Sequence, residues 1–177
     1  GANRKRTSQA LTALVDTTGI PFFTTQMGKG VVDERHPAYI GTSALSSDDF
    51  VHCAIRKADL IVNVGHDIVE KPPFFMEHGG AKVIHVNFSP ANVDEVYFPQ
   101  LNVVGDIASS VIGITKEISG YSGWDFSYFR KIKDNFADHL EEYAGDSRFP
   151  ILSQRFIKIL RKEIPEDGIV ALDNGMY

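Results

Sequence analysis

The chain has 177 residues and a formal net charge of −5, from 18 basic and 23 acidic side chains. Its 43% hydrophobic and 23% charged residues are typical of a folded globular protein and exclude disordered, collagen-like and coiled-coil chains. The mild acidity argues against a nucleic-acid partner, because a basic surface is needed to attract a phosphate backbone. No apolar stretch reaches the length of a bilayer span, so we expect no membrane partner. The single cysteine, Cys53, fits a reducing compartment and the first residues show no signal-peptide pattern, so we expect a cytoplasmic location.

Helical and β-type patterns alternate along the first two thirds of the chain. In chain order they predict a helix over 8–18, a strand over 22–25, a helix over 47–57, strands over 60–64, 82–87 and 101–104, and a helix over 107–118. Thr7 or Ser8 is expected to cap the first helix, and Gly19 to end it. Ser46 and Asp49 form a capping box ahead of the second helix.

The predicted strands indicate the fold class. The runs at 60–64 and 82–87 are rich in β-branched residues and lack strict alternation, which is typical of parallel strands that are covered on both faces. Strands that alternate with helices predict an α/β fold with a doubly wound, Rossmann-like and mainly parallel sheet flanked by helices. In such a sheet, ligands bind at the loops that follow the carboxyl ends of the strands.

The last third of the chain has a different character. A Ser/Gly-rich stretch at 119–123 marks the clearest change of composition. Beyond it we predict a long helix over 124–143, a helix over 153–163 and a strand over 168–172. We therefore expect a central α/β domain at 1–120, a linker with a long helix at 121–150, and the start of a further domain at 151–177. Since the first residue is not Met and the chain stops just past a predicted strand, we expect a fragment of a longer protein, with a further strand upstream.

Two glycine pairs are candidates for a ligand site. Gly65 and His66 directly follow the strand at 60–64, while Gly105 and Asp106 follow the strand at 101–104. Glycine lets a ligand approach the backbone closely, so these positions predict a nucleotide-type groove, although each glycine could also serve an ordinary turn. The basic segment 1–5 precedes a helix and is either the end of a phosphate-binding loop or a solvated terminus.

The residues reveal no catalytic machinery. The six histidines form no His-Glu-x-x-His pattern, and one cysteine excludes a thiolate zinc cage, so we expect no metal site. No serine lies in a Gly-x-Ser-x-Gly elbow. His52 and His85 lie within predicted elements, where packing or hydrogen bonding is the commoner role. The acidic pairs Asp48/Asp49 and Asp67/Glu70 are interpreted as caps and solvated faces. The residues alone therefore predict a binding layer without catalytic residues.

Five motifs in order carry a family resemblance. They lie at 24–30 (Thr-Thr-Gln-Met-Gly-Lys-Gly), at 36–41 (His-Pro, then Tyr-Ile-Gly), at 58–65 (Ala-Asp-Leu-Ile-Val-Asn-Val-Gly), at 82–90 (Lys-Val-Ile-His-Val-Asn-Phe-Ser-Pro) and at 103–107 (Val-Val-Gly-Asp-Ile). Over about residues 1–118 the chain resembles the central domain of thiamine-diphosphate enzymes of the acetolactate synthase family, in their large catalytic subunit. Residues 168–177 are similar to the first strand and turn of that family's pyrophosphate-binding domain.

The resemblance implies a parent enzyme that condenses two pyruvate molecules into 2-acetolactate with loss of CO₂. Thiamine diphosphate and Mg²⁺ would be its cofactors, held by the two other domains, and the full-length enzyme would be a homo-oligomer. The metal signature of the family's third domain, Gly-Asp-Gly with paired asparagines, does not occur in this chain. We therefore expect no catalytic residue here, and an inactive fragment that contributes a structural domain.

Biosynthetic members of the family hold FAD in this domain. The resemblance would place its contacts at Thr25, Gln26, Met27, Gly41, Thr42, Gly65, His66, Gly105 and Asp106. Two departures argue against FAD. The biosynthetic Arg-Phe-Asp-Asp-Arg stretch is replaced by residues 66–71, and Asn87 stands where those enzymes carry an acid. The Asp-Ile-Val-Glu stretch resembles instead the catabolic acetolactate synthases, which do not need FAD, so we expect an unused FAD site.

Three other functions remain open. The parent could be another thiamine-dependent carboligase or decarboxylase, such as a glyoxylate carboligase or an oxoacid decarboxylase. The chain could instead be a free-standing nucleotide-binding module, because the same architecture serves NAD-dependent proteins. The third alternative is a purely structural interaction domain.

Overall fold

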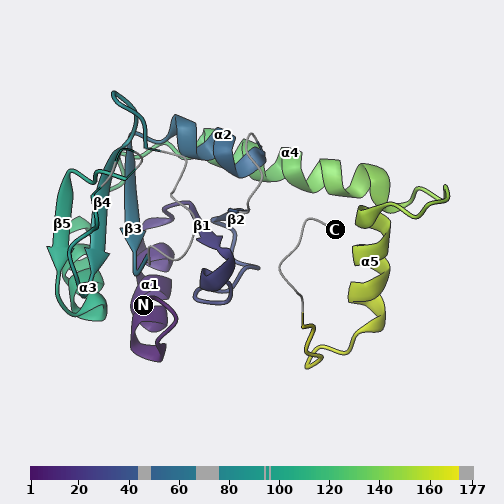
Figure 1. Ribbon diagram of the computed structural model, residues 1–177, viewed down its shortest axis with the longest axis horizontal. Coiled ribbons are helices and arrows are strands. Elements are labelled where there is room, and N and C mark those ends of the chain that lie inside the picture. Colours follow the sequence, from purple (N-terminus) through teal and green to yellow (C-terminus); the bar gives the residue numbers. More distant parts are fainter. Residues whose placement is uncertain (44–48, 67–75, 94, 96, 172–177) are drawn as a thin grey trace. The chain divides into compact units, whose positions relative to one another are not determined.

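Figure 1 shows a computed structural model of the chain, which describes residues 1–43, 49–66, 76–93, 95 and 97–171. Its elements follow in the order α1 (Lys5–Thr18), β1 (Phe22–Thr25), the 3-10 helix η1 (Gln26–Gly28), β2 (Tyr39–Ser43), α2 (Phe50–Lys57), β3 (Leu60–Val64), β4 (Lys82–Asn87), β5 (Leu101–Val104), α3 (Ile107–Ile118), α4 (Ser127–Ala144) and α5 (Ser153–Glu163). The chain divides into two compact units, residues 1–134 and 135–177, which are described separately.

The strands of the first unit form two parallel sheets. β1 pairs with β2, while β3, β4 and β5 pair in that order, with Asn63 opposite His85 and Val86 opposite Val103. The predicted class, a parallel α/β fold flanked by helices, is confirmed. Among the described residues, however, the pairing is divided over two sheets, where the sequence predicted one.

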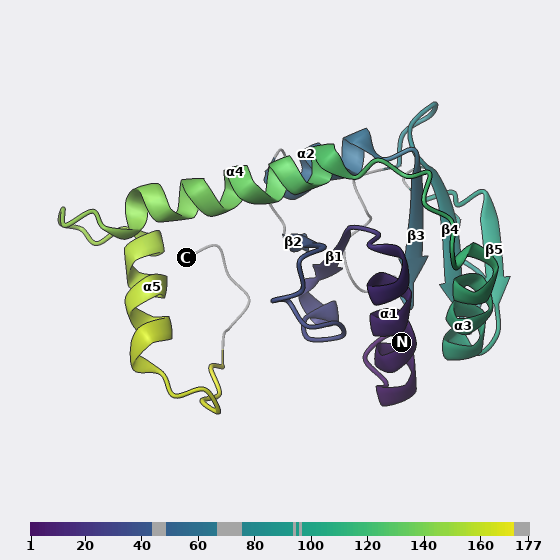
Figure 2. The same ribbon diagram turned by 180° about the vertical axis from the view of Figure 1, so that it is seen from behind.

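Two helices cover one face of the β3–β4–β5 sheet. Side chains alternate along β4, so Ile84 and Val86 point to the face on which α1 and α3 pack. Val86, Ile107 and Val111 are fully buried there, and Leu14 of α1 is buried beside them. Figure 2 shows α1 and α3 lying side by side against this sheet. This apolar layer holds α1, the first helix of the chain, against α3 and the sheet.

The opposite face of the same sheet packs against α2. Val83 and Ile61 point to this face and form a cluster with Val51 and Ile55 of α2. Tyr97, from the connection between β4 and β5, is part of the same cluster and is 6% exposed. The apolar layer on this face is therefore made by α2 together with Tyr97, a side chain from a loop.

Helix α2 also packs against the smaller sheet. Its Ala54 is almost fully buried and lies in a cluster with Ile40 of β2 and Ile132 of α4. Phe23 of β1 packs against both the α2 cluster and this one. Helix α2 thus connects the two sheets into one unit.

The first predicted helix begins earlier than expected, and the predicted cap is wrong. Helix α1 starts at Lys5, and Arg4 holds the N-cap position without a capping hydrogen bond from its side chain. Thr7 is buried within the helix, and the Ser8 hydroxyl donates to the carbonyl of Val31 at 2.5 Å. Both side chains are used in tertiary contacts, which local capping rules do not register. The predicted stop at Gly19 is confirmed by its left-handed φ of 66°.

Other boundaries differ in smaller ways. Strand β2 was not predicted. Asp49 caps α2 by accepting the His52 N–H, whereas Ser46 and residues 47 and 48 lie outside the described residues. Helix α4 begins at 127 instead of 124, because the Asp125 carboxylate accepts the backbone N–H of residue 127 in a turn before the helix. Residues 168–171 form no strand, contrary to the prediction, because a β-type run becomes a strand only where its backbone groups pair with another strand; residue 172 lies outside the described range.

The second unit contains the end of α4 and all of α5. Lys158 of α5 forms an ion pair with Glu141 of α4, and Arg155 donates to the backbone carbonyl of Asp146 at 2.7 Å. The apolar side chains of α5 remain largely on its surface, with Phe156 and Ile157 more than half exposed. Among the described helices, none combines the length and apolar character that a bilayer span requires.

Candidate functional site

The loops after β3 and β5 meet at one edge of the larger sheet. The N–H of Gly65 donates to the carbonyl of Val86, and the N–H of Gly105 donates to the carbonyl of Asn87, both at 2.9 Å. Both glycines have a positive φ, of 68° and 153°. The structure therefore brings Gly65, with His66 next to it, and Gly105 to the two sides of the end of β4.

The first residues of the chain also reach this edge. A Cβ atom added at Gly65 would lie 2.4 Å from the backbone nitrogen of Ala2 and 3.0 Å from the carbonyl carbon of Gly1. Such distances are far inside van der Waals contact, so only glycine fits at position 65. The segment ahead of α1 is therefore packed against the loop after β3, beside the buried side chain of Ile107.

Two arginines at the start of α1, Arg4 and Arg6, contact the sheet edge. Arg6 forms an ion pair with Asp106 at 2.9 Å and also donates to the hydroxyl of Ser109 at 3.0 Å. Asp106 caps α3 by accepting the Ser109 N–H at 2.8 Å. Hydrogen bonds from Ser109, and then the Arg6 guanidinium, lower the pKa of Asp106. The Arg4 guanidinium lies over the ring of Phe88, 5.0 Å from its centroid.

Asn87 connects the loops that follow β3 and β4. Its side-chain NH₂ donates to the carbonyl of His66 at 2.8 Å, and its side-chain oxygen accepts the N–H of Phe88 at 2.8 Å. The amide is thus satisfied within the chain, at the position where the FAD-binding pattern has an acid.

The other predicted contacts belong to the smaller sheet. Thr25 ends β1, Gln26 and Met27 form η1, and Gly41 and Thr42 lie in β2. A Cβ atom at Gly41 would lie 2.9 Å from Val51 Cγ2, so helix packing already requires glycine there. The nine predicted positions therefore form two groups on two sheets.

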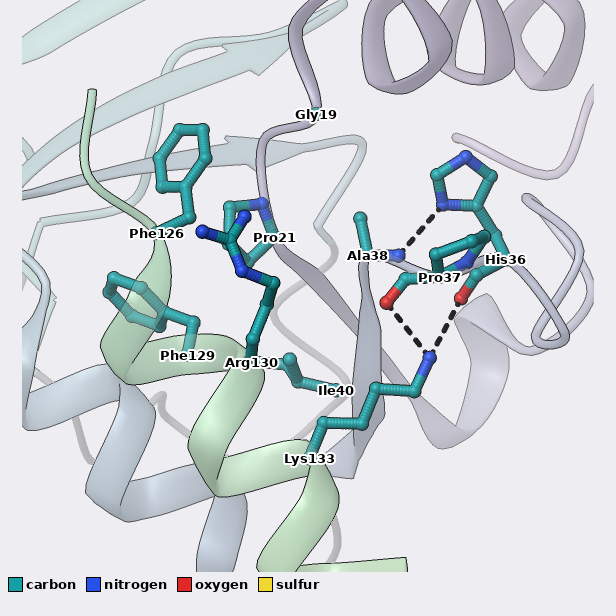
Figure 3. A pocket seen from close by; sticks show the side chains of 10 residues that line it. All are labelled: Gly19, Pro21, His36, Pro37, Ala38, Ile40, Phe126, Phe129, Arg130 and Lys133. Carbon is teal, nitrogen blue, oxygen red and sulfur yellow. Dashed lines mark hydrogen bonds between the residues drawn. The ribbon is translucent and has the colours of Figure 1, made fainter. Parts of the chain in front are cut away.

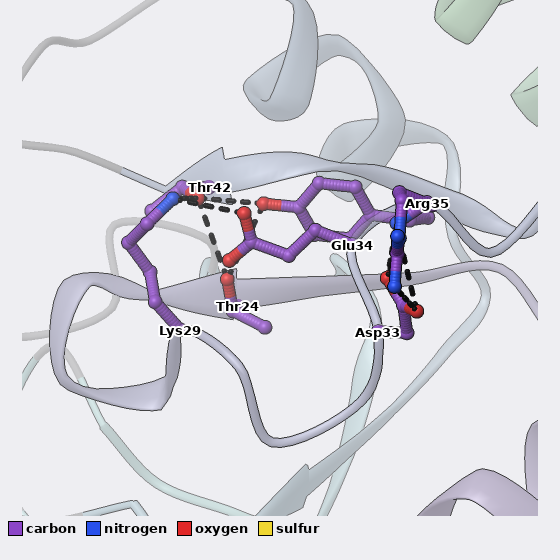
Figure 4. Close-up of polar contacts among 7 residues, drawn as sticks. Thr24, Lys29, Asp33, Glu34, Arg35 and Thr42 are labelled. Carbon is purple, nitrogen blue, oxygen red and sulfur yellow. Dashed lines mark hydrogen bonds and ion pairs between the residues drawn. The ribbon is translucent and has the colours of Figure 1, made fainter. Parts of the chain in front are cut away.

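The polar contacts around Thr42 are shown in Figure 4. Its hydroxyl lies 2.7 Å from that of Tyr39 and 3.4 Å from that of Thr24 on the neighbouring strand. Lys29 donates to Thr42 at 3.3 Å and forms an ion pair with Glu34 at 3.1 Å. This network orients the loop after η1 against the sheet.

A buried polar cluster under β3 and β4 was missed by sequence reasoning. Nδ1 of His85 lies 2.7 Å from the hydroxyl of Tyr97, which also accepts the side-chain NH₂ of Asn63 at 2.8 Å. His85 is 3% exposed, and its Nε2 has no hydrogen-bond partner among the described residues. Burial lowers the pKa of His85, an effect that the backbone of Ser89 opposes, and burial raises the pKa of Tyr97. His52 bonds to Asp49, so both histidines have the hydrogen-bonded packing roles that were predicted.

The larger sheet's edge suits an anionic group better than a complete dinucleotide. Glycine backbone, the N-terminus of α1 and the side chain of Arg4 favour negative charge at this edge, whereas Arg6 is already paired with Asp106. Asn87 and Asp106, which could recognise a ribose or a base, are already bonded within the chain. A phosphate group would meet the glycine backbone and Arg4 here, whereas a sugar or base would have to displace the internal bonds of Asn87 and Asp106. Across the part of the chain that the structure describes, no group of three or more His, Cys, Asp or Glu could hold a metal.

Comparison with known proteins identifies the family. The model of the thiamine pyrophosphate enzyme central domain matches residues 1–114, more than half of the 177-residue chain. The acetolactate synthase large subunit of Corynebacterium glutamicum is 26% identical over 96% of this chain and 28% of its own length. The acetolactate synthase large subunit of Porphyra purpurea is 30% identical over 93% of this chain and 28% of its own length.

A third relative carries a different name. The 2-hydroxyacyl-CoA lyase of Oryza sativa is 31% identical over 98% of this chain and 30% of its own length. The chain thus spans less than a third of the length of these relatives. The motifs at the strand ends, the parallel sheets and the family match agree, and the chain belongs to the family of thiamine pyrophosphate enzyme central domains.

Proposed function

We propose that this chain is the central domain of an enzyme of the acetolactate synthase type, which condenses two pyruvate molecules into 2-acetolactate with release of CO₂. The observation that carries the proposal is the central-domain match over residues 1–114, together with large-subunit relatives that align with more than nine tenths of the chain. Because those relatives are more than three times longer, the proposed activity is that of a larger protein of which this chain is one part.

The proposed contribution of this chain is structural. Thiamine diphosphate, when bound in the enzyme, supplies the electron sink for decarboxylation, and Mg²⁺ holds its diphosphate. We assign both to domains other than this one, because the described residues include no cluster of metal ligands. The packed sheets and α2 instead provide a rigid spacer, and the loop at Gln26–Gly28 after β1 is exposed, with Met27 74% accessible.

We further propose that FAD is not required. The internal bonds of Asn87 and Asp106 support this, since a bound dinucleotide would have to replace them. Purified chain titrated with FAD should show no quenching of flavin fluorescence at micromolar concentration. Quenching that is lost in Gly65→Val but kept in Gly19→Val would overturn this part of the proposal.

The rice relative favours a second candidate. A 2-hydroxyacyl-CoA lyase at 31% identity supports another thiamine-dependent enzyme as the parent. The acetolactate synthase assignment is preferred because several relatives from different organisms carry that name.

We infer that the complete enzyme is a cytoplasmic homo-oligomer that acts on pyruvate or another 2-oxo acid.

The test uses the 177-residue chain and the complete protein encoded with it. With pyruvate, thiamine diphosphate and Mg²⁺, the complete protein should form acetolactate, measured as acetoin after acid decarboxylation, whereas the chain alone should form none. A complete protein that cleaves a 2-hydroxyacyl-CoA but leaves pyruvate unchanged would replace the first candidate by the second. Turnover by the chain alone would contradict the proposed division of roles.

A further inference from the structure

A cavity of about 180 Å³ lies between the start of α4 and the smaller sheet. Figure 3 shows its two walls, with Phe126, Phe129 and Arg130 from the α4 side and Pro21 and Ile40 from the side of β1 and β2. All the residues that line it belong to the first unit, and none of them is one of the candidate cofactor contacts at the sheet edges. It is therefore a separate feature of the domain.

The walls are apolar, and their size fits a single ring. Two phenylalanines, two prolines and an isoleucine supply most of the surface. An apolar cavity of about 150 Å³ in another protein holds one benzene molecule. The present cavity, at about 180 Å³, can accommodate a phenyl ring or a branched alkyl group of similar size.

The charges at this cavity have one sign. Among the ten lining residues, Arg130 and Lys133 are cationic and none is acidic, although the whole chain carries a net charge of −5. Lys133 donates to the backbone carbonyls of His36 at 3.1 Å and Pro37 at 2.8 Å, so one of its three ammonium protons remains available. Among the described residues Arg130 forms no ion pair, although it helps to lower the pKa of the exposed Asp125.

His36 uses both of its ring nitrogens within the chain. The N–H of Ala38 donates to His36 Nδ1 at 3.0 Å, so Nδ1 is assigned as an acceptor and the ring proton is assigned to Nε2. Nε2 lies 3.2 Å from the carboxylate of Asp16, which can accept that proton. Both ring nitrogens therefore have partners within the chain, and the cationic side chains that remain for a ligand are Arg130 and Lys133.

We propose that this cavity binds a small amphipathic carboxylate, with an aromatic or branched apolar group between Phe126, Phe129 and Ile40 and the carboxylate at Arg130. The guanidinium offers paired N–H donors that match the two oxygens of a carboxylate. The proposal is independent of the activity proposed above, because it concerns a cavity that includes none of the candidate cofactor residues.

The probe is phenylacetate, which joins one ring to one carboxylate with ten non-hydrogen atoms. Titration of the ¹⁵N-labelled 177-residue chain should shift the backbone amides of Gly19, Ala38 and Lys133, with a Kd of about 1 mM or below for a ligand of this size. The matched probes 2-phenylethanol and 2-phenylethylamine have the same ring without the negative charge and should bind about tenfold more weakly or not at all.

Two variants test the site itself. Arg130→Gln should raise the Kd for phenylacetate by about tenfold, the effect expected from one charge-assisted contact at a partly exposed site. Ala38→Leu should block the cavity, whereas Arg161→Gln on α5 should leave the Kd unchanged. Thermal unfolding shows whether each variant remains folded, and Arg130, being exposed, can be changed without disturbing the core. No binding of phenylacetate at 10 mM, equal binding of the amine, or an unchanged Kd in folded Arg130→Gln would each overturn the proposal.

Discussion

Gly65→Ala tests the packing of the amino-terminal segment against the sheet edge. Its φ of 68° is left-handed, and an L side chain in that conformation loses about 1–2 kcal/mol. The added methyl group would also meet the Ala2 nitrogen at 2.4 Å, and an overpacked contact of this kind is destabilising by about 1–3 kcal/mol. The total expected loss in unfolding free energy is about 2–5 kcal/mol.

Gly19→Ala is the matched control. Gly19 has nearly the same φ, 66°, but no atom lies within 4 Å of an added Cβ. This variant should therefore lose only the conformational part, about 1–2 kcal/mol. Hydrogen exchange of the β3 and β4 amides measures the difference in unfolding free energy between the two variants within the first unit. Deleting Gly1 and Ala2 should bring Gly65→Ala close to the control, because the colliding atoms are then gone. Equal losses in the two variants before any deletion would refute the reasoning.

Three further predictions concern the two faces of the larger sheet. Tyr97→Phe should destabilise the domain by about 1–3 kcal/mol in urea unfolding, because Asn63 and His85 lose their shared partner. Burial lowers the pKa of His85. Below about pH 6.5 the unfolded chain therefore binds a proton at this histidine more readily than the folded chain does. The unfolding free energy should therefore fall as the pH drops from about 7.5 to 5.5, with a smaller slope in His85→Gln. Ile107→Ala, at a fully buried position, should lose about 2–5 kcal/mol, and Ile112→Ala, which is 38% exposed on the same helix, less than about 1 kcal/mol.

Each of these results has a clear contrary outcome. A stable Tyr97→Phe variant would mean that the hydroxyl does not satisfy the buried groups around it. A pH slope that is unchanged in His85→Gln would assign the proton uptake to another residue. Similar losses for Ile107→Ala and Ile112→Ala would contradict the packing of α3 against α1 and β4.

The central strands could be predicted from the sequence to the residue. β3, β4 and β5 have the predicted bounds because each is a short apolar run, rich in β-branched residues, that ends at a turn. β2 was missed because Gly41, which disfavours strands, interrupts a short run whose Tyr39, Ile40 and Thr42 are otherwise typical of a strand. Its conformation comes from pairing with β1, where Phe23 lies opposite Gly41 and Thr24 opposite Thr42.

The candidate site was predictable only in part. The carboxyl ends of parallel strands meet at one edge, so the proximity of Gly65 and Gly105 follows from the fold class. The ion pair of Arg6 with Asp106 joins residues one hundred positions apart, and no local pattern indicates it. The same holds for the Tyr97 hydroxyl beneath His85, because Tyr97 comes from an irregular connection.

The polar cluster beneath β3 and β4 also restricts how the larger sheet can assemble. If β4 shifted by one position along β3, the imidazole of His85 would turn toward the all-apolar layer of α1 and α3 and lose Tyr97. An unpaired imidazole in that layer would disfavour the shifted arrangement. Val83 and Val86 alone would distinguish the native from the shifted pairing poorly, because a valine is apolar on either face of the sheet. The cluster thus disfavours misaligned strands. Without it, the domain should reach its native strand pairing more slowly, and a fraction of the molecules should hold the shifted pairing.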